Sequence, residues 1–160
     1  MADEAAPGEA FWRFSLDFYA RPGVSAACLA LQDDHGLDVN LALYACWVGW
    51  SGGGRLGAAD VATAEQRVAS WRGGVIAPLR AARRALKQEN VAALYAEAKA
   101  LELAAEREAQ RRLAAGAPLP HCRSEGERAA DARANLLLYL GDGAARQTAE
   151  PLLAALAPVP

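Results

Sequence analysis

The sequence predicts an all-α protein: a single compact bundle of about six to eight helices with a buried apolar helix near residues 39–50. Three observations favour this fold class. Alanine is the commonest residue, and Leu, Arg and Glu, which are also strong helix formers, supply much of the rest. No stretch alternates apolar and polar residues as a half-buried strand would. The stretch 39–50 is apolar on nearly every side, which is typical of the central helix of a bundle.

The chain length of 160 residues suits one domain. We expect a flexible tail over residues 1–8 and a single helical domain over residues 9–157. The first helix, about residues 9–19, places three phenylalanines and a serine on one face, and the sequence Arg-Pro-Gly at 21–23 ends it. A second helix fits residues 24–32.

Capping residues place the other helices. Asp38, Asp60 and Asn90 are predicted N-caps, and Ser124 is predicted to form a capping box with Glu127. The remaining helices are expected over about residues 39–50, 60–70, 71–88 or 74–88, 91–115, 124–140 and 151–156.

Charge and hydropathy exclude several classes of protein. The net charge of −2 argues against a nucleic-acid-binding protein, which needs an excess of positive charge. No apolar run reaches the roughly 18 residues that a membrane span requires, and the acidic start of the chain does not resemble a secretory signal. The three cysteines are odd in number and far apart, as reduced cytosolic thiols would be. We therefore expect a cytoplasmic protein that binds neither nucleic acid nor a membrane.

The first candidate site is the turn between the second and third helices. Three carboxylates, an imidazole and two amides lie within residues 32–40, and its candidate binding residues are Gln32, Asp33, Asp38 and Asn40. Oxygen ligands at short range could hold a hard cation, but the spacing does not match the calcium-loop pattern. The alternative is that each polar side chain caps a helix or satisfies a local backbone group, which is the commoner use of such residues.

The second candidate is a group of aromatic residues. Asn40, Tyr44 and Trp47 share one helical face, and Trp12 lies on the first helix. Stacked rings beside an amide could form a pocket for a planar ligand. Aromatic stripes are more often core residues whose polar atoms find partners within the protein.

The third candidate is a basic stripe on the helix over about residues 74–88. Arg80, Arg83, Arg84 and Lys87 follow the spacing i, i+3, i+4, i+7, so they cover one face. The stripe could bind an acidic partner or a phosphate group. The alternative is a solvated face whose cations pair with carboxylates of the next helix, such as Glu102.

A signature in the N-terminal half carries a family resemblance. It reads FW-x-FSL-x-x-Y from Phe11, then GV-x-x-ACL-x-LQD from Gly23, then G-x-DVN from Gly36. In this respect the chain resembles a small family of uncharacterised proteobacterial proteins of about this length that carry a domain of unknown function. The resemblance implies no activity, no catalytic residues and no cofactor.

The sequence contains no phosphate-binding glycine loop, nucleophile elbow or zinc-protease motif, and we expect no metal or other cofactor. We therefore favour a non-enzymatic cytoplasmic adaptor that binds another protein through the 32–40 turn and the basic stripe. The alternative is a helical bundle, an enzyme included, that binds a small molecule or a metal. Asp33, Asp38 and Asn40 would then lie beside an aromatic pocket, and a small anion would be a suitable ligand.

Overall fold

The structure, a computed structural model, describes residues 6–157 and confirms the predicted all-helical bundle. Within that range no residue belongs to a strand. The elements in chain order are α1 (Pro7–Tyr19), α2 (Val24–His35), α3 (Val39–Trp50), α4 (Ala58–Trp71), the π-helical turn η1 (Arg72–Ile76), α5 (Ala77–Gln88), α6 (Ala92–Ala114), α7 (Glu125–Leu140), α8 (Ala144–Thr148) and α9 (Glu150–Ala155).

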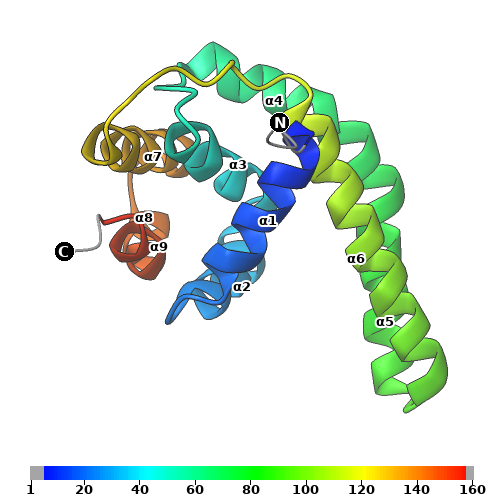
Figure 1. Ribbon diagram of the computed structural model, residues 1–160. Coiled ribbons are helices and arrows are strands. Elements are labelled where there is room, and N and C mark those ends of the chain that lie inside the picture. Colours follow the sequence, from blue (N-terminus) through cyan, green and yellow to red (C-terminus); the bar gives the residue numbers. More distant parts are fainter. Residues whose placement is uncertain (1–5, 158–160) are drawn as a thin grey trace.

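Helix α3 is the centre of the bundle, as the sequence predicts. Every residue from Asn40 to Gly49 is buried. Helices α1, α2, α6 and α7 pack around it, and its most extensive contact is with α7 (Figure 1). Because apolar side chains cover all sides of α3, burial against several neighbours is the arrangement that removes them from water.

A glycine allows the close approach of α3 and α7. A Cβ atom built on Gly49 would lie 2.1 Å from the backbone nitrogen of Ala132. No side chain fits into that space, since real Cβ atoms do not approach other heavy atoms so closely. The two backbones are therefore in direct contact at this crossing.

Helices α5 and α6 form a hairpin that projects from the bundle (Figure 1). No residue of α5 is buried, and all the buried residues of α6 lie at Glu102 or beyond it in the chain. We call residues 77–103 the arm. The rest of α6 packs on α1, α3 and α4 and attaches the arm to the bundle.

The arm is joined to α4 through η1. The backbone N–H of Ala77 donates to the carbonyl of Arg72, five residues earlier, which widens the helix by one residue. Such π-helical turns are often found at functional sites. Pro78 lies in the first turn of α5, where its missing N–H breaks no hydrogen bond of that helix.

Two predicted caps are confirmed and two are wrong. Asp38 caps α3, and Ser124 forms its capping box with Glu127. Asp60 is the third residue of α4, where its carboxylate accepts a hydrogen bond from the backbone of Gly57 instead of capping the helix itself. Asn90 has a φ of 59° and makes no cap, because the turn before α6 requires a left-handed residue there.

Two further boundaries differ from the expectation, and one of them is the end of α2, which lies at His35 and not at residue 32. Helix α1 begins at Pro7, so residues 7–8 of the expected tail are helical, and residues 1–5 lie outside the described range. Within residues 6–157, no helix combines the length and the apolar character needed to cross a membrane.

We predict that Gly49→Ala strongly destabilises the fold. The added methyl group would collide with the backbone of α7, and overpacking of this severity costs about 3 kcal/mol. Urea unfolding followed by circular dichroism measures the loss. Gly126→Ala on α7 is the control, because a Cβ there meets nothing within 4 Å. Equal stability of the Gly49→Ala variant and the wild type would show that α3 and α7 are not in backbone contact.

Candidate binding groove

A groove with a volume of about 830 Å³ lies between the arm and the helices α1, α2 and α3. Side chains from α1, α2, α3, η1, α5 and α6 line it, together with Tyr139 of α7 and Glu65 of α4. Ligand sites in proteins usually measure about 300–1,000 Å³, so the groove is large enough for a ligand of substantial size.

The base of the groove is a chain of buried hydrogen bonds. The Ser15 hydroxyl donates to the side-chain oxygen of Gln110 at 3.0 Å, and the amide of Gln110 donates to the side-chain oxygen of Asn40 at 3.1 Å. The amide of Asn40 in turn donates to Glu106. These bonds connect α1, α6 and α3, and each donor finds an acceptor, as buried polar groups require.

This series of hydrogen bonds continues from Glu106 into a group of ion pairs with α5 of the arm. Arg80 of α5 donates to Glu106 at 2.7 Å and to Glu102 at 3.2 Å. Arg83 also donates to Glu102. Burial favours the neutral form of a carboxyl group, but the hydrogen bonds from Arg83 and Arg80 outweigh it and lower the pKa of Glu102. Glu102 is therefore ionised near pH 7.

Glu106 has the opposite shift. Burial raises the pKa of this carboxyl, and the nearby charge of Asp38 raises it further. The hydrogen bond from Asn40 and the charge of Arg80 oppose this rise without cancelling it. A carboxyl group with a raised pKa in a groove is a usual feature of a binding site or an active site.

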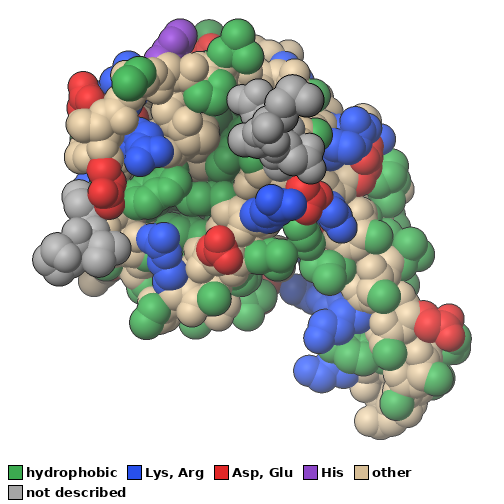
Figure 2. Space-filling model, viewed as in Figure 1, with side chains coloured by type: hydrophobic (Ala, Val, Ile, Leu, Met, Phe, Trp, Pro, Cys, Tyr) green, Lys and Arg blue, Asp and Glu red, His purple; other side chains and the backbone are tan. Residues whose placement is uncertain are grey.

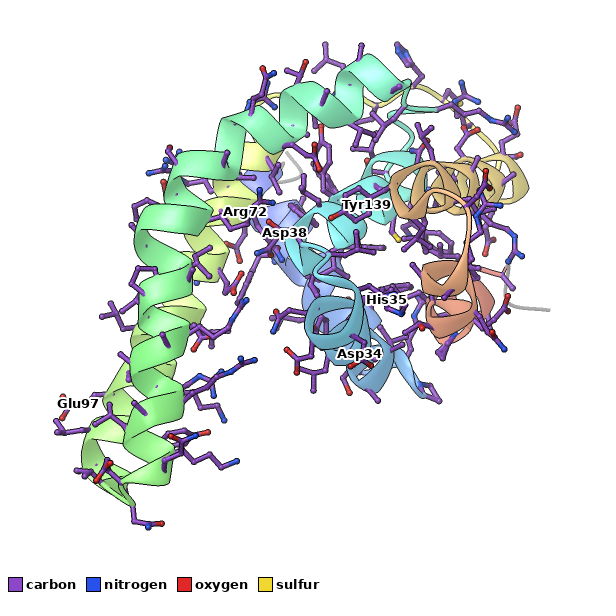
Figure 3. The ribbon with its side chains drawn as sticks, turned by 180° about the vertical axis from the view of Figure 1, so that it is seen from behind. Asp34, His35, Asp38, Arg72, Glu97 and Tyr139 are labelled. Atoms are coloured by element: carbon purple, nitrogen blue, oxygen red, sulfur yellow. The ribbon has the colours of Figure 1, made fainter. Side chains whose placement is uncertain are left out.

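A second polar cluster that lines the groove contains Asp38, Arg72 and Tyr139, which lie close together in Figure 3. Arg72 of η1 pairs with the Asp38 carboxylate at 3.1 Å, and the second carboxylate oxygen accepts from the backbone of Asn40. The Tyr139 hydroxyl accepts from the backbone N–H of Asp38 and donates to its carbonyl. Asp38 thus connects the start of α3 to η1 and α7.

Leucines line the mouth of the groove. Leu16 of α1 is 53 % exposed, Leu29 of α2 is 57 % exposed and Leu103 of α6 is 55 % exposed. The half-buried rings of Trp12 and Tyr19 add apolar surface beside them. Three large apolar side chains exposed around one groove mark a place where a ligand or partner would remove them from water.

The structure brings six of the predicted site residues into this groove: Trp12, Gln32, Asp38, Asn40, Arg80 and Arg83. Asp33 and Arg84 pair with each other at 3.0 Å, between α2 and α5, with both side chains more than half exposed. Lys87 is exposed one turn further along the arm. The 32–40 turn and the basic stripe, which are far apart in the sequence, therefore face each other.

Tyr44 lies elsewhere. It is buried in the core, where its ring meets Phe11 edge to face, and Trp47 stacks on the same phenylalanine. Tyr44 also borders a cavity of about 80 Å³ on the other side of α3. Asn40 and Tyr44 consequently do not share a pocket, and the aromatic stripe of α3 is core.

Sequence reasoning missed part of the groove. Gln110, Arg72 and Tyr139 were not singled out, because each gains its role only through contacts between distant helices. Glu102 was foreseen as a partner of the basic stripe, and it does pair with Arg80 and Arg83. Gln110 is only 3 % exposed. A glutamine on the helix face that is predicted to be buried was the signal that could have found it.

The carboxylates that line the groove take part in contacts between helices. Asp38, Glu102 and Glu106 accept hydrogen bonds from arginine or asparagine side chains. These bonds connect α3 with α6, the start of α3 with η1, and α5 with α6. In the described part of the chain, no group of three or more His, Cys, Asp or Glu side chains could hold a metal ion.

We predict that Glu106→Gln changes the pH dependence of stability. Because the pKa of Glu106 is raised in the folded protein, its contribution to stability is complete below the ordinary value of 4.5 and is lost as the pH rises through the folded-state pKa. The free energy of unfolding of the variant, minus that of the wild type, should therefore increase with pH above 4.5. Urea unfolding at a series of pH values measures this difference.

Glu108→Gln on the same helix is the control. Hydrogen bonds from Arg111 and Arg112 lower the pKa of Glu108 to about 2, so its stabilising contribution is present above the ordinary value and lost as the pH falls. The corresponding difference should decrease as the pH rises from about 2 to 4.5. A decrease for Glu106→Gln as well would contradict the assignment of Glu106 as a destabilised buried carboxylate.

Comparison with known proteins gives one match. No curated protein and no solved structure matches the chain. A family model described as a protein of unknown function (DUF2390) matches residues 10–113. This segment runs from α1 to the end of α6, and it holds every residue that lines the groove except Tyr139. The chain belongs to the DUF2390 family of proteins of unknown function.

Proposed function

We propose that this protein is a non-enzymatic binding protein of the cytoplasm, and that its groove receives a segment of a partner protein. The observation that carries the proposal is the convergence of Leu16, Leu29 and Leu103, from three helices, on one open groove. Because each leucine is already nearly half buried, covering the rest of it would contribute about 1 kcal/mol to binding. The free, buried thiols of Cys28 and Cys46 are consistent with a reducing compartment.

The shape of the groove favours a macromolecular segment over a metabolite. Its exposed leucines come from three helices, Leu16 from α1, Leu29 from α2 and Leu103 from α6. The arm on one side is made of helices that bury almost nothing along their outer half. An occupant that contacts all three leucines spans three helices, which favours a helix or a peptide over a metabolite.

A small anionic ligand is the second candidate. It is favoured by the polar base of the groove, where the amide of Asn40 and the guanidinium of Arg80 both donate to Glu106, whose pKa is raised by burial. A ligand of this kind would raise the melting temperature of the protein at millimolar concentration without any peptide. That result from a screen of small carboxylates and phosphates would favour this candidate.

Selection from a library of helical peptides of about 16 residues tests the main proposal. We expect peptides that bind the wild type and that lose at least about tenfold in affinity to Leu29→Ser or Leu103→Ser, because each change removes an apolar contact. Surface changes of this kind leave the stability nearly unchanged.

Leu101→Ser is the matched control, since Leu101 lies on the same helix as Leu103 and is 56 % exposed, but does not line the groove. Affinities should be unchanged in that variant. Peptides that bind all three variants equally, or a library that yields no binder, would refute the proposed function.

A further inference from the structure

The side of the arm that faces the body is basic. Arg80, Arg83, Arg84 and Lys87 follow one face of α5, and Figure 2 shows Lys and Arg side chains gathered where the arm faces the rest of the molecule. Glu97 of α6, by contrast, points away from the body on the far side of the arm (Figure 3). The two sides of the arm therefore differ in charge.

Arg80 and Arg83 line the groove, whereas Arg84 and Lys87 lie next to it on α5. Arg80 and Arg83 are neutralised by Glu102 and Glu106. Arg84 has one partner, Asp33, and both side chains of that pair are more than half exposed, so water and salt screen it. Lys87 makes no ion pair with any residue of the described range 6–157.

We infer that the partner segment is an acidic amphipathic helix, an inference that rests on the proposed function. Its apolar face would cover Leu16, Leu29 and Leu103, and its acidic edge would lie along Arg84 and Lys87. Charge complementarity favours an acidic edge on the partner helix. Its carboxylates would pair with Lys87, which makes no ion pair in the described range, and with Arg84, whose pair with Asp33 is exposed.

The partner segment is inferred to be a helix because helices and the turn between α2 and α3 line the groove. An extended peptide gains affinity by adding to a sheet edge, and residues 6–157 contain no strand to which it could add. A helix satisfies its own backbone hydrogen bonds and needs only side-chain contacts. The arm offers α5 as a wall of 12 residues, which corresponds to about 18 Å or three turns of a docked helix.

Two synthetic peptides of about 16 residues test the inference. Both carry leucine at i, i+3, i+4 and i+7 on one face, and they differ only in having glutamate or lysine along one edge. Fluorescence anisotropy with the full chain measures their affinities at low and at physiological salt. A single-stranded RNA of about the same length is the third probe, because a basic face could also attract a nucleic acid.

The acidic peptide should bind at least about tenfold more tightly than the basic one, with an affinity that falls as salt rises. Lys87→Glu and Arg84→Glu should each weaken it about fivefold to tenfold. Arg133→Glu is the matched control, since Arg133 lies on α7 and donates to the backbone of Leu153, away from the groove. Its affinity for the acidic peptide should equal that of the wild type.

Three results would overturn the inference. Equal binding of the two peptides would show that the arm does not select by charge, and equal loss in Arg133→Glu would show that only net charge matters. Tighter binding of the RNA than of the acidic peptide would assign the basic face to a nucleic acid. If the helical library still yields peptides that depend on Leu29 and Leu103, the proposed function stands and only the acidic character of the partner is wrong.

Discussion

The side chain of Asn40 makes two hydrogen bonds on which the groove depends. Its oxygen accepts from Gln110 and its nitrogen donates to Glu106, so one amide at the start of α3 holds two successive turns of α6. Glu106 then holds Arg80 of α5. The arm is thereby tied to the buried centre of the bundle through polar groups, whereas α5 and the part of α6 before Glu102 contain no buried residue. Replacing either partner would leave a buried donor or acceptor unpaired, at a cost of about 1–3 kcal/mol.

The polar groups at the base of the groove, Asn40, Glu106 and Gln110, lie beside an open side that is lined with leucines. The groups at the base of the groove are held by hydrogen bonds between α1, α3, α5 and α6, and such buried polar networks fix the relative positions of the elements they join. Around this base, Leu16, Leu29 and Leu103 are more than half exposed, and Arg84 of the arm pairs with Asp33 of α2. The polar base and the exposed leucines are thus parts of one groove.

The sequence predicts the helices well because their signals are local. The apolar face of α3, Asp38 as its cap and the capping box at Ser124 each depend on residues within a few positions. The spacing of the basic stripe also predicted correctly that its cations share a face. The groove could not be predicted in the same way. The contacts of Ser15 and Asn40 with Gln110 join residues 95 and 70 positions apart, and no local pattern records which of many possible helix pairs will meet. Asn90 failed as a cap for a related reason, since the same residue type also suits a left-handed turn.

Occupation of the groove is the central claim, and methyl NMR of leucine residues tests it most directly. A peptide selected by the protein would be titrated into the full chain while the methyl signals of Leu16, Leu29, Leu101 and Leu103 are followed. We predict that the signals of Leu16, Leu29 and Leu103 shift together with one dissociation constant and that the signal of Leu101 does not move. A shift of Leu101 with no change at Leu29 and Leu103 would place the partner on the outer side of the arm and contradict a binding role for the groove.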